Sequence, residues 1–281
     1  MHALKRIVSK SRGVKRNIEQ QLDWQFRRAT SKARALPHFI IIGAMKGGTT
    51  SLFNYLAQHP QILETQKKEV HYFDNNYDRG EPWYRAHFPL RESIRSGYIT
   101  GEASPLYLFN PLVAHRIRQL VPNARLIAML RNPTERAISH YFHEVRRGRE
   151  PLSLMEALHQ EETRMREVVQ NRDYQSMTYI HTSYKQRGKY KEQLERYLAC
   201  FPREHLLLVN SEDFFEKPQD VLSTVFRFIG VDDAFEVGDL HPRNRGRNRT
   251  DVDSAVYDYL DAYFAPHNEA LYRLLGYRFD W

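Results

Sequence analysis

The stretch IIIGAMKGGTTSLFNYL, residues 40–56, constrains the fold more than any other part of this 281-residue chain. An apolar run stops at Gly43, a glycine-rich turn with one lysine follows, and an amphipathic pattern begins at the threonines. A helix that starts directly after a strand presents unpaired N–H groups at its positive end, so such a turn is typical of an anion site. Glycines let the backbone approach a phosphate closely.

Short apolar runs alternate with helical patterns along the rest of the chain. Strands are predicted at 38–42, 98–102, 124–130 and 205–210, and helices at 50–59, 111–122, 133–148, 152–169, 190–201, 218–230 and 252–275. This alternation is typical of βαβ units with a parallel sheet. We therefore predict an α/β fold of the P-loop type, in which a central, mostly parallel sheet is flanked by helices in three layers.

The net charge of +8 is confined to one end of the chain. Residues 1–36 hold ten lysines and arginines against two acidic residues, and the remainder holds 32 of each sign. We therefore divide the chain into a basic extension, 1–36, and a domain, 37–281, and expect the domain to fold without the extension. Because the domain is balanced, no nucleic-acid partner is expected. The extension is interpreted as a solvated helix or as a peripheral contact with an anionic membrane.

Composition also indicates the compartment. The single cysteine, Cys200, cannot form an intrachain disulfide, which fits a reducing environment. No apolar run approaches the roughly 18 residues of a membrane span, and no signal peptide is evident. We expect a cytoplasmic protein, with possible attachment at the inner membrane face only through residues 1–36. The thirteen histidines show no metal-ligand spacing, so no metal is expected.

The loop departs from the Walker A pattern at one position. Gly43 and Gly48 have the Walker spacing, but Thr49 stands where the lysine of an ATPase would be, and Lys46 lies inside the loop. In an ATPase the lysine reaches the β- and γ-phosphates and a hydroxyl holds Mg²⁺. A lysine within the loop suits a shorter 5′ group.

Five motifs in order resemble a known family. GAMKGGTTSL resembles the 5′-phosphosulfate loop of sulfotransferases that use 3′-phosphoadenosine-5′-phosphosulfate (PAPS). The segments 68–89, 101–111, 126–143 and 243–249, together with the ending GYRFDW, are similar to heparan sulfate glucosaminyl O- and N-sulfotransferases, here as a bacterial-type soluble member. The resemblance covers residues 38–281. It implies PAPS as donor, 3′-phosphoadenosine 5′-phosphate (PAP) as product, and transfer to an acceptor hydroxyl or amine.

The resemblance also assigns residues to the donor. The loop residues are Lys46, Gly47, Gly48, Thr49 and Thr50, and Lys46 also stabilises the leaving phosphate. Arg131 and Ser139 would bind the 3′-phosphate, because Arg131 ends an apolar strand and Ser139 lies two turns into the next helix. Arg245, Gly246 and Arg247 would close over the nucleotide. Relatives usually carry a disulfide before this loop, which one cysteine cannot supply.

The acceptor side needs a base. The resemblance assigns this role to Glu69, with His71 as a further catalytic or acceptor-orienting group, since residues two apart in an extended segment share a side. Asp74, Glu102, Ser104 and Tyr190 are further candidates for acceptor binding. Ala103 stands where heparan-modifying relatives usually have a lysine, which weakens the expectation of a heparan-like acceptor.

Three alternatives stay open beside a PAPS-dependent sulfotransferase acting on a carbohydrate or a small-molecule hydroxyl. The same chemistry could serve a lipid or carrier-bound hydroxyl. A P-loop kinase would use ATP and Mg²⁺, but the strand LIAML ends at Arg131, where a Walker B strand ends in aspartate. A non-catalytic protein could bind polyanions through residues 1–36 and the arginine-rich loop.

Overall fold

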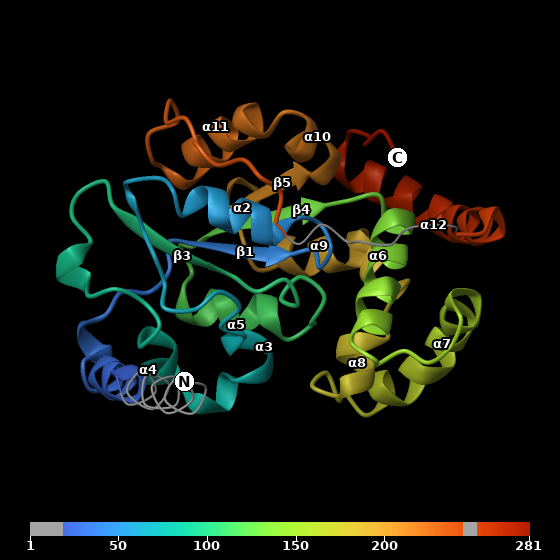
Figure 1. The fold of residues 1–281 in the computed structure, drawn as a ribbon, viewed down its shortest axis with the longest axis horizontal. Helices are drawn as coiled ribbons and strands as arrows, with labels where there is room; N and C mark the ends of the chain where they lie inside the picture. Colours follow the sequence, from blue (N-terminus) through green and yellow to red (C-terminus); the bar gives the residue numbers. More distant parts are fainter. Residues whose placement is uncertain (1–18, 244–251) are drawn as a thin grey trace, which may run out of the picture.

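The computed structural model describes residues 19–243 and 252–281 and forms one parallel sheet between two layers of helices (Figure 1). The strands are β1 Phe39–Gly43, β2 Ile62–Leu63, β3 Ile99–Ala103, β4 Arg125–Leu130 and β5 Leu206–Asn210. Their order is β2-β3-β1-β4-β5, and every pairing is parallel. The predicted fold class is confirmed. β1 lies between β3 and β4, at the point where the chain changes direction across the sheet, which is where α/β folds bind ligands.

Alternate residues of β1 supply the two cores. All five residues of β1 are buried. Ile40 and Ile42 pack into a cluster with α3, α5 and α9, whereas Phe39 and Ile41 pack with α2, α10 and α11 on the opposite face. A strand covered on both faces reads as a continuous apolar run, as it does here.

Eleven labelled α-helices surround the sheet in the described residues. They are α2 Thr49–Leu56, α3 Tyr72–Asn75, α4 Glu81–Arg85, α5 Val113–Leu120, α6 Pro133–Arg146, α7 Leu154–Gln170, α8 Met177–His181, α9 Tyr190–Leu198, α10 Ser211–Glu216, α11 Pro218–Ile229 and α12 Ser254–Leu275. The longer helices match the predicted ones to within a few residues. The short helices α3, α4, α8 and α10, and the two-residue strand β2, were not predicted.

Helix α6 begins where its sequence predicts. The Asn132 side chain accepts hydrogen bonds from the backbone N–H groups of Thr134 and Glu135, at 2.9 and 3.2 Å, and Pro133 occupies the first turn. Beyond the sheet, α6 packs with α7 and α12 in a separate apolar cluster, seen beside the sheet in Figure 1. The helix therefore runs from the carboxyl end of β4 outward along one side of the site.

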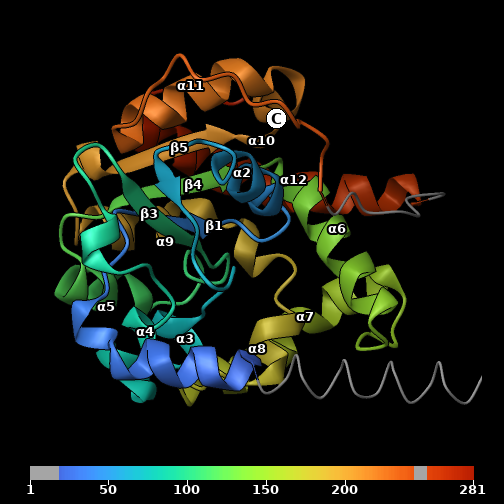
Figure 2. The ribbon, with the colours of Figure 1, turned by 60° about the vertical axis from the view of Figure 1, so that its left-hand side comes forward.

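The second half of the basic extension packs on the domain. Residues 19–29 form a helix that lies beside α4 (Figure 2). The ring of Trp24 lies 4.8 Å from that of His87 and 6.3 Å from that of Trp83, centroid to centroid. Arg34 is buried and donates to the carbonyl of Phe88 at 2.8 Å. These contacts are at odds with the expectation that the domain is independent of all of residues 1–36.

Of the helices in the two described ranges, none has both the length and the apolar character that a bilayer crossing requires.

Truncation separates the two parts of the extension. We predict that a chain starting at Glu19 unfolds in urea at the same midpoint as the full chain. A chain starting at Ala35 loses Trp24 and is expected to be less stable by about 1–3 kcal/mol, because two aromatic contacts disappear. Trp24→Ala in the full chain should reproduce most of this loss. Equal stability of all four proteins would show that residues 19–34 do not pack on the domain in solution.

Candidate functional site

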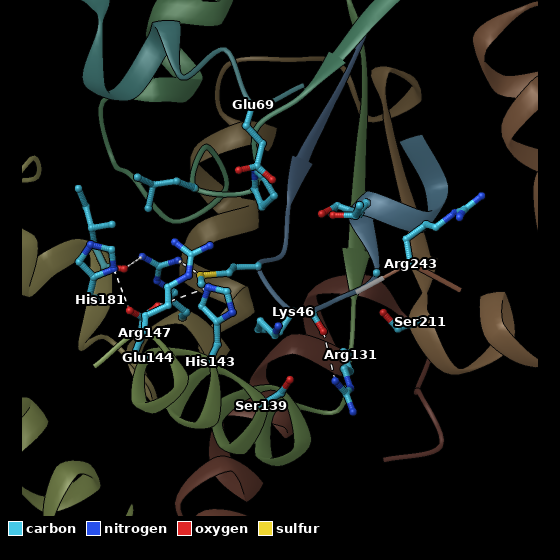
Figure 3. Close-up of a pocket in the computed structure, with 18 of the residues that line it drawn as sticks. Lys46, Glu69, Arg131, Ser139, His143, Glu144, Arg147, His181, Ser211 and Arg243 are labelled. Atoms are coloured by element: carbon cyan, nitrogen blue, oxygen red, sulfur yellow. Dashed lines mark hydrogen bonds and ion pairs between the residues drawn. The ribbon is translucent and has the colours of Figure 1, made fainter. Parts of the chain in front are cut away.

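A cavity of about 960 Å³ opens at the carboxyl ends of β1 and β4. Its wall is formed by the loop after β1, the segment before α3, one side of α6, and residues of α8 and α10 (Figure 3). In this view Glu69 lies at one end, Arg131 and Ser139 lie at the other, and Lys46 lies between them. The structure thus brings together residues from segments that are far apart in the sequence.

The loop of residues 43–50, here called the donor loop, has a backbone that depends on two glycines. Gly48 precedes α2 with φ of 97°, a conformation that favours glycine, and Lys46 has φ of 70°. A Cβ at Gly47 would lie 2.8 Å from the carbonyl oxygen of Met129, so no larger residue fits. The hydroxyl of Ser211 donates to the carbonyl of Gly47 and ties the loop to the start of α10. The loop is therefore held in one shape by its neighbours.

The threonines that follow differ in their surroundings. Thr49 is buried at the start of α2 and lines the cavity. The hydroxyl of Thr50 accepts a hydrogen bond from Lys68 Nζ at 3.0 Å. Lys46, Gly48, Thr49 and Thr50 all line the cavity, and Gly47 joins Lys46 to Gly48. All five predicted loop residues are thus contiguous with one anion-binding helix start.

Arg131 and Ser139 share the cavity wall next to the donor loop. The guanidinium of Arg131 donates to the carbonyl oxygen of Lys46 at 3.2 Å and to the carboxylate of Glu135 at 3.1 Å. Ser139 lies two turns along α6 on the side that faces the cavity (Figure 3). A cation and a hydroxyl on one wall are the groups that a phosphate dianion requires.

Tyr190 lies outside the cavity wall. Its side chain is buried, and its hydroxyl donates to the carbonyl oxygen of Arg131 at 2.8 Å. It therefore anchors the end of β4, and the structure offers no direct path from Tyr190 to an acceptor.

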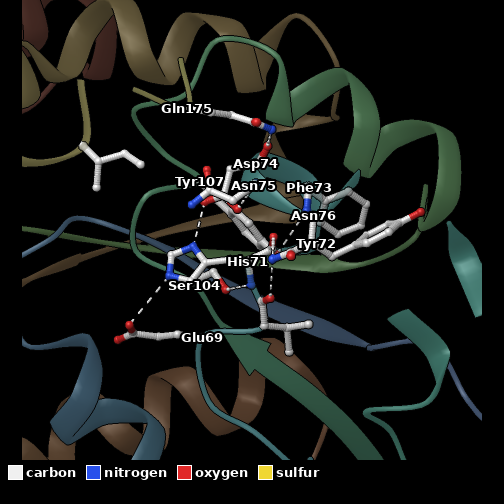
Figure 4. Close-up of polar contacts among 12 residues, drawn as sticks. Glu69, His71, Tyr72, Phe73, Asp74, Asn75, Asn76, Ser104, Tyr107 and Gln175 are labelled. Carbon is white, nitrogen blue, oxygen red and sulfur yellow. Dashed lines mark hydrogen bonds and ion pairs between the residues drawn. The ribbon is translucent and has the colours of Figure 1, made fainter. Parts of the chain in front are cut away.

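Glu69, His71 and Asp74 form a chain of charges at the opposite end of the cavity (Figure 4). His71 Nδ1 lies 2.8 Å from Asp74 Oδ2, and His71 Nε2 lies 3.7 Å from Glu69 Oε2. Lys68 Nζ donates to Glu69 Oε1 at 2.6 Å. Glu69 and His71 both have positive φ, 61° and 54°, so the segment turns at each of them and is not extended as expected. Their side chains nevertheless reach the same cavity, whereas that of Asp74 is buried behind His71.

The interactions among Glu69, His71 and Asp74 determine the protonation of Glu69 and His71. The interaction with His71, opposed by burial and supported by Lys68, lowers the pKa of Glu69 to about 2. Burial alone would lower the pKa of His71, but its interactions with Asp74 and Glu69 outweigh burial and raise that pKa to about 9. At neutral pH Glu69 is therefore an anion and His71 a cation. Of the two, only Glu69 can accept a proton.

Glu102 and Ser104 lie behind the cavity. Glu102 is 0% exposed and accepts hydrogen bonds from the hydroxyls of Tyr84, Ser104 and Tyr107, at 2.7, 2.8 and 3.1 Å. Ser104 is equally buried and accepts a hydrogen bond from the backbone N–H of His71 at 3.1 Å. These two residues support the segment that carries His71, and neither offers an acceptor a surface to contact.

The arginine-rich loop can be followed only to its first residue. Arg243 lines the cavity, and its backbone N–H donates to the hydroxyl of Ser51 on α2 at 2.9 Å. Arg245, Gly246 and Arg247 lie outside the described residues. In the described ranges, no group of three histidine, cysteine, aspartate or glutamate side chains is arranged to hold a metal ion.

Sequence reasoning missed the side of the cavity formed by α6 and α8. His143, Glu144, Arg146, Arg147, Arg149, His181 and Arg187 also line it. A signal was available, because the motif SHYFHEVRR places Ser139, His143, Arg146 and Arg147 at positions i, i+4, i+7 and i+8, which form one face of a helix. Because Ser139 was already a predicted site residue, this spacing could have implicated His143, Arg146 and Arg147 as well.

The fold and this cavity define an α/β protein with a loop and a helix start suited to bind an anion. A family model described as the sulfotransferase domain matches residues 36–241, and the chain belongs to this family and is a sulfotransferase. A crystal structure of a sulfotransferase from Alicyclobacillus acidocaldarius superposes with a TM-score of 0.71 at 34% identity, over 87% of this chain and 98% of that one. The predicted family resemblance is confirmed.

Curated relatives match most of this chain but differ in length. The membrane-associated sulfotransferase kil1 of Dictyostelium discoideum is 30% identical over 89% of this chain and 67% of its own length. Human heparan sulfate glucosamine 3-O-sulfotransferase 3B1 is 30% identical over 89% of this chain and 66% of its own length. The chain spans 30% of the human bifunctional heparan sulfate N-deacetylase/N-sulfotransferase 3, to which it is 29% identical.

The protonation of His71 can be measured directly. We predict that its ring protons titrate in NMR spectra with a pKa of about 9, and that Asp74→Asn lowers this value by removing a partner of the cation. Since the pKa is raised from 6.5, the stability gained from these interactions is complete below pH 6.5 and is lost as the pH rises through about 9. Titration of His71 near 6.5 in the wild type would contradict the geometry described above.

Proposed function

We propose that this sulfotransferase takes its sulfuryl group from PAPS and transfers it to a hydroxyl or amine of a carbohydrate. The observation that supports this most is the shared cavity. Lys46, Arg131 and Ser139 line it beside the start of α2, and Glu69 lines it from the other end. An anionic donor needs cations and hydrogen-bond donors, which Lys46, Arg131 and Ser139 supply at one end of the cavity. A nucleophile that must lose a proton needs a base, which Glu69 supplies from the other end.

The donor loop would hold the 5′-phosphosulfate. Its backbone N–H groups at the start of α2, the Lys46 ammonium and the hydroxyls of Thr49 and Thr50 are donors of the kind that phosphate oxygens accept. Arg131 and Ser139 would bind the 3′-phosphate. Arg245, Gly246 and Arg247 are proposed to cover the nucleotide, as the family resemblance implies.

The transfer is proposed as an in-line displacement at sulfur. The acceptor oxygen or nitrogen forms a bond to sulfur while the bond between sulfur and the bridging phosphate oxygen breaks. The acceptor's proton passes to the Glu69 carboxylate, and PAP leaves with the bridging oxygen and its negative charge. Lys46 offsets that charge as it develops. His71, protonated at neutral pH, is suited to donate a hydrogen bond that orients Glu69 or the acceptor.

The acceptor class rests on the relatives. The two human relatives act, by their names, on heparan sulfate, which favours a carbohydrate over a lipid or carrier-bound hydroxyl. The name of the Dictyostelium relative supports testing residues 1–36 as a peripheral membrane contact of a cytoplasmic protein.

Isothermal titration with PAP and with ATP–Mg²⁺ tests this proposal against its alternatives. We expect PAP to bind and ATP–Mg²⁺ to bind far more weakly, because Lys46 lies within the loop and no aspartate follows β4. Preferential binding of ATP–Mg²⁺ would favour a kinase. Binding of neither nucleotide, with retention on heparin, would favour a non-catalytic polyanion-binding protein.

Replacing the loop lysine tests leaving-group stabilisation. We expect Lys46→Ala to lower turnover by about 10²–10³-fold, the loss typical of one such group, with little change in melting temperature. Lys191→Ala is the control, because this half-exposed lysine pairs with Glu195 on α9 and is not among the residues that line the cavity. Turnover of Lys46→Ala close to that of Lys191→Ala would exclude the role.

The base is tested by an isosteric change. Glu69→Gln keeps the shape of the side chain but cannot accept the proton, so turnover should fall by about 10²–10⁴-fold while PAP affinity stays the same. Glu64→Gln, at an exposed position in the same segment, is the control. If His71→Asn abolishes turnover and Glu69→Gln does not, the two assignments must be exchanged.

A further inference from the structure

A buried arginine lies in the part of the cavity wall that the proposed reaction does not use. Arg187, in the short 3₁₀ helix Gln186–Gly188, is 3% exposed and lines the cavity. Its Nε donates to the hydroxyl of Ser183 at 2.8 Å, and its Nη2 to the carbonyl of Ile180 at 2.7 Å. Its Nη1 lies 2.8 Å from the thioether sulfur of Met45, which belongs to the donor loop.

The hydrogen-bond partners of this guanidinium, namely Ser183, Ile180 and Met45, are all neutral. In the described part of the chain, no carboxylate lies within ion-pair distance of Arg187, and Glu144 and Glu161 act on it only at longer range. A thioether is a weak acceptor for a charged donor. Burial, together with the nearby charge of Arg136, lowers the pKa of Arg187 to about 10, so it is still a cation at neutral pH. A buried charge without a counter-ion is unfavourable until an anion reaches it.

The surroundings add positive charge on the same side. Arg146, Arg147 and Arg149, here called the arginine rim, are exposed and line the cavity at the end of α6. The carboxylate of Glu144 is already engaged with His181 at 3.2 Å (Figure 3). It also pairs with Arg149 at 3.4 Å. His143 is neutral at pH 7, because burial lowers its pKa to about 4, so it adds no charge to this side. The field at this side of the cavity is therefore cationic.

We infer that Arg187 and the arginine rim form a subsite for an anionic group of the acceptor, such as a carboxylate, sulfate or phosphate. The inference rests on the proposed function, because it assumes that Lys46, Arg131 and Ser139 bind the donor. Those groups supply cations and a hydroxyl for the donor's two phosphates. Arg187 instead bonds to the α8 segment that carries His181. The subsite supplies a positive charge in place of the lysine that heparan-modifying relatives usually have at the position of Ala103.

Two tetrasaccharide probes that differ only at their carboxylates test the subsite. One alternates N-acetylglucosamine with glucuronate, and in the other each glucuronate is reduced to glucose. Their affinities for the complex of the full chain with PAP are measured by titration calorimetry, so no turnover is required. We expect the wild type to prefer the glucuronate probe by about 10–100-fold, as for a charge-assisted hydrogen bond.

Variants assign the preference to Arg187. Arg187→Gln should abolish it without changing PAP affinity, and Arg187→Lys should retain most of it. Because Arg187 is buried, melting temperatures are measured in parallel. Arg147→Gln, which is exposed and does not threaten the fold, should weaken the preference more than Arg227→Gln on α11 does.

Each contrary outcome is distinct. Equal affinity for the two probes, or binding of neither, overturns the subsite even if the protein transfers sulfuryl groups. Loss of PAP affinity in Arg187→Gln with an intact preference would assign Arg187 to the donor and also overturn it. Failure of the wild type to bind PAP, in contrast, overturns the proposed function itself.

Discussion

The position of the proposed base depends on a carboxylate that never reaches the cavity. Glu102, at the end of β3, is buried and collects three hydroxyl hydrogen bonds, from Tyr84, Ser104 and Tyr107. Two of these hydroxyls in turn accept backbone N–H groups, Ser104 from His71 and Tyr107 from Tyr72. The central sheet thereby fixes the segment that carries Glu69 and His71. Burial raises the pKa of Glu102, while the three hydroxyls and His71 oppose the rise.

The network explains an unusual backbone. Glu69 and His71 both occupy the left-handed region, which is strained for residues with a side chain. The backbone N–H of Glu69 donates to the carbonyl of Ala103 at 3.0 Å, two residues before the bond between His71 and Ser104. Bonds to successive residues at the end of β3 hold the two turns open toward the cavity. Hydrogen bonds to the sheet offset the cost of this conformation, so the segment that carries Glu69 and His71 needs no regular structure of its own.

Sequence patterns predicted the strands and helices that are long enough to show a regular pattern of apolar residues. Continuous apolar runs identified β1, β4 and β5, and caps identified α6, because Asn132 and Pro133 act locally. The four- and five-residue helices α3, α4 and α8 are too short to show a period, and their form depends on contacts with distant strands. For the same reason Glu102 and Tyr190 looked like acceptor residues. Their burial depends on neighbours that pack from elsewhere in the chain, which no local pattern reveals.

The placement of charges around the cavity likewise depends on the fold and does not follow from the net charge of the domain. The domain is balanced overall, yet Arg146, Arg147, Arg149 and Arg187 gather on one side of its cavity, and Glu69 lies at the end opposite Arg131. Lys68 links the proposed base to the donor loop, because its ammonium donates to Glu69 Oε1 at 2.6 Å and to Thr50 Oγ1 at 3.0 Å. An anion bound at the donor loop competes for the hydroxyl of Thr50 and for the ammonium. Drawing Lys68 away from Glu69 removes one of the influences that lower the pKa of this carboxylate. Occupation of the donor loop would then make Glu69 a stronger base when a sulfuryl group is present to be transferred.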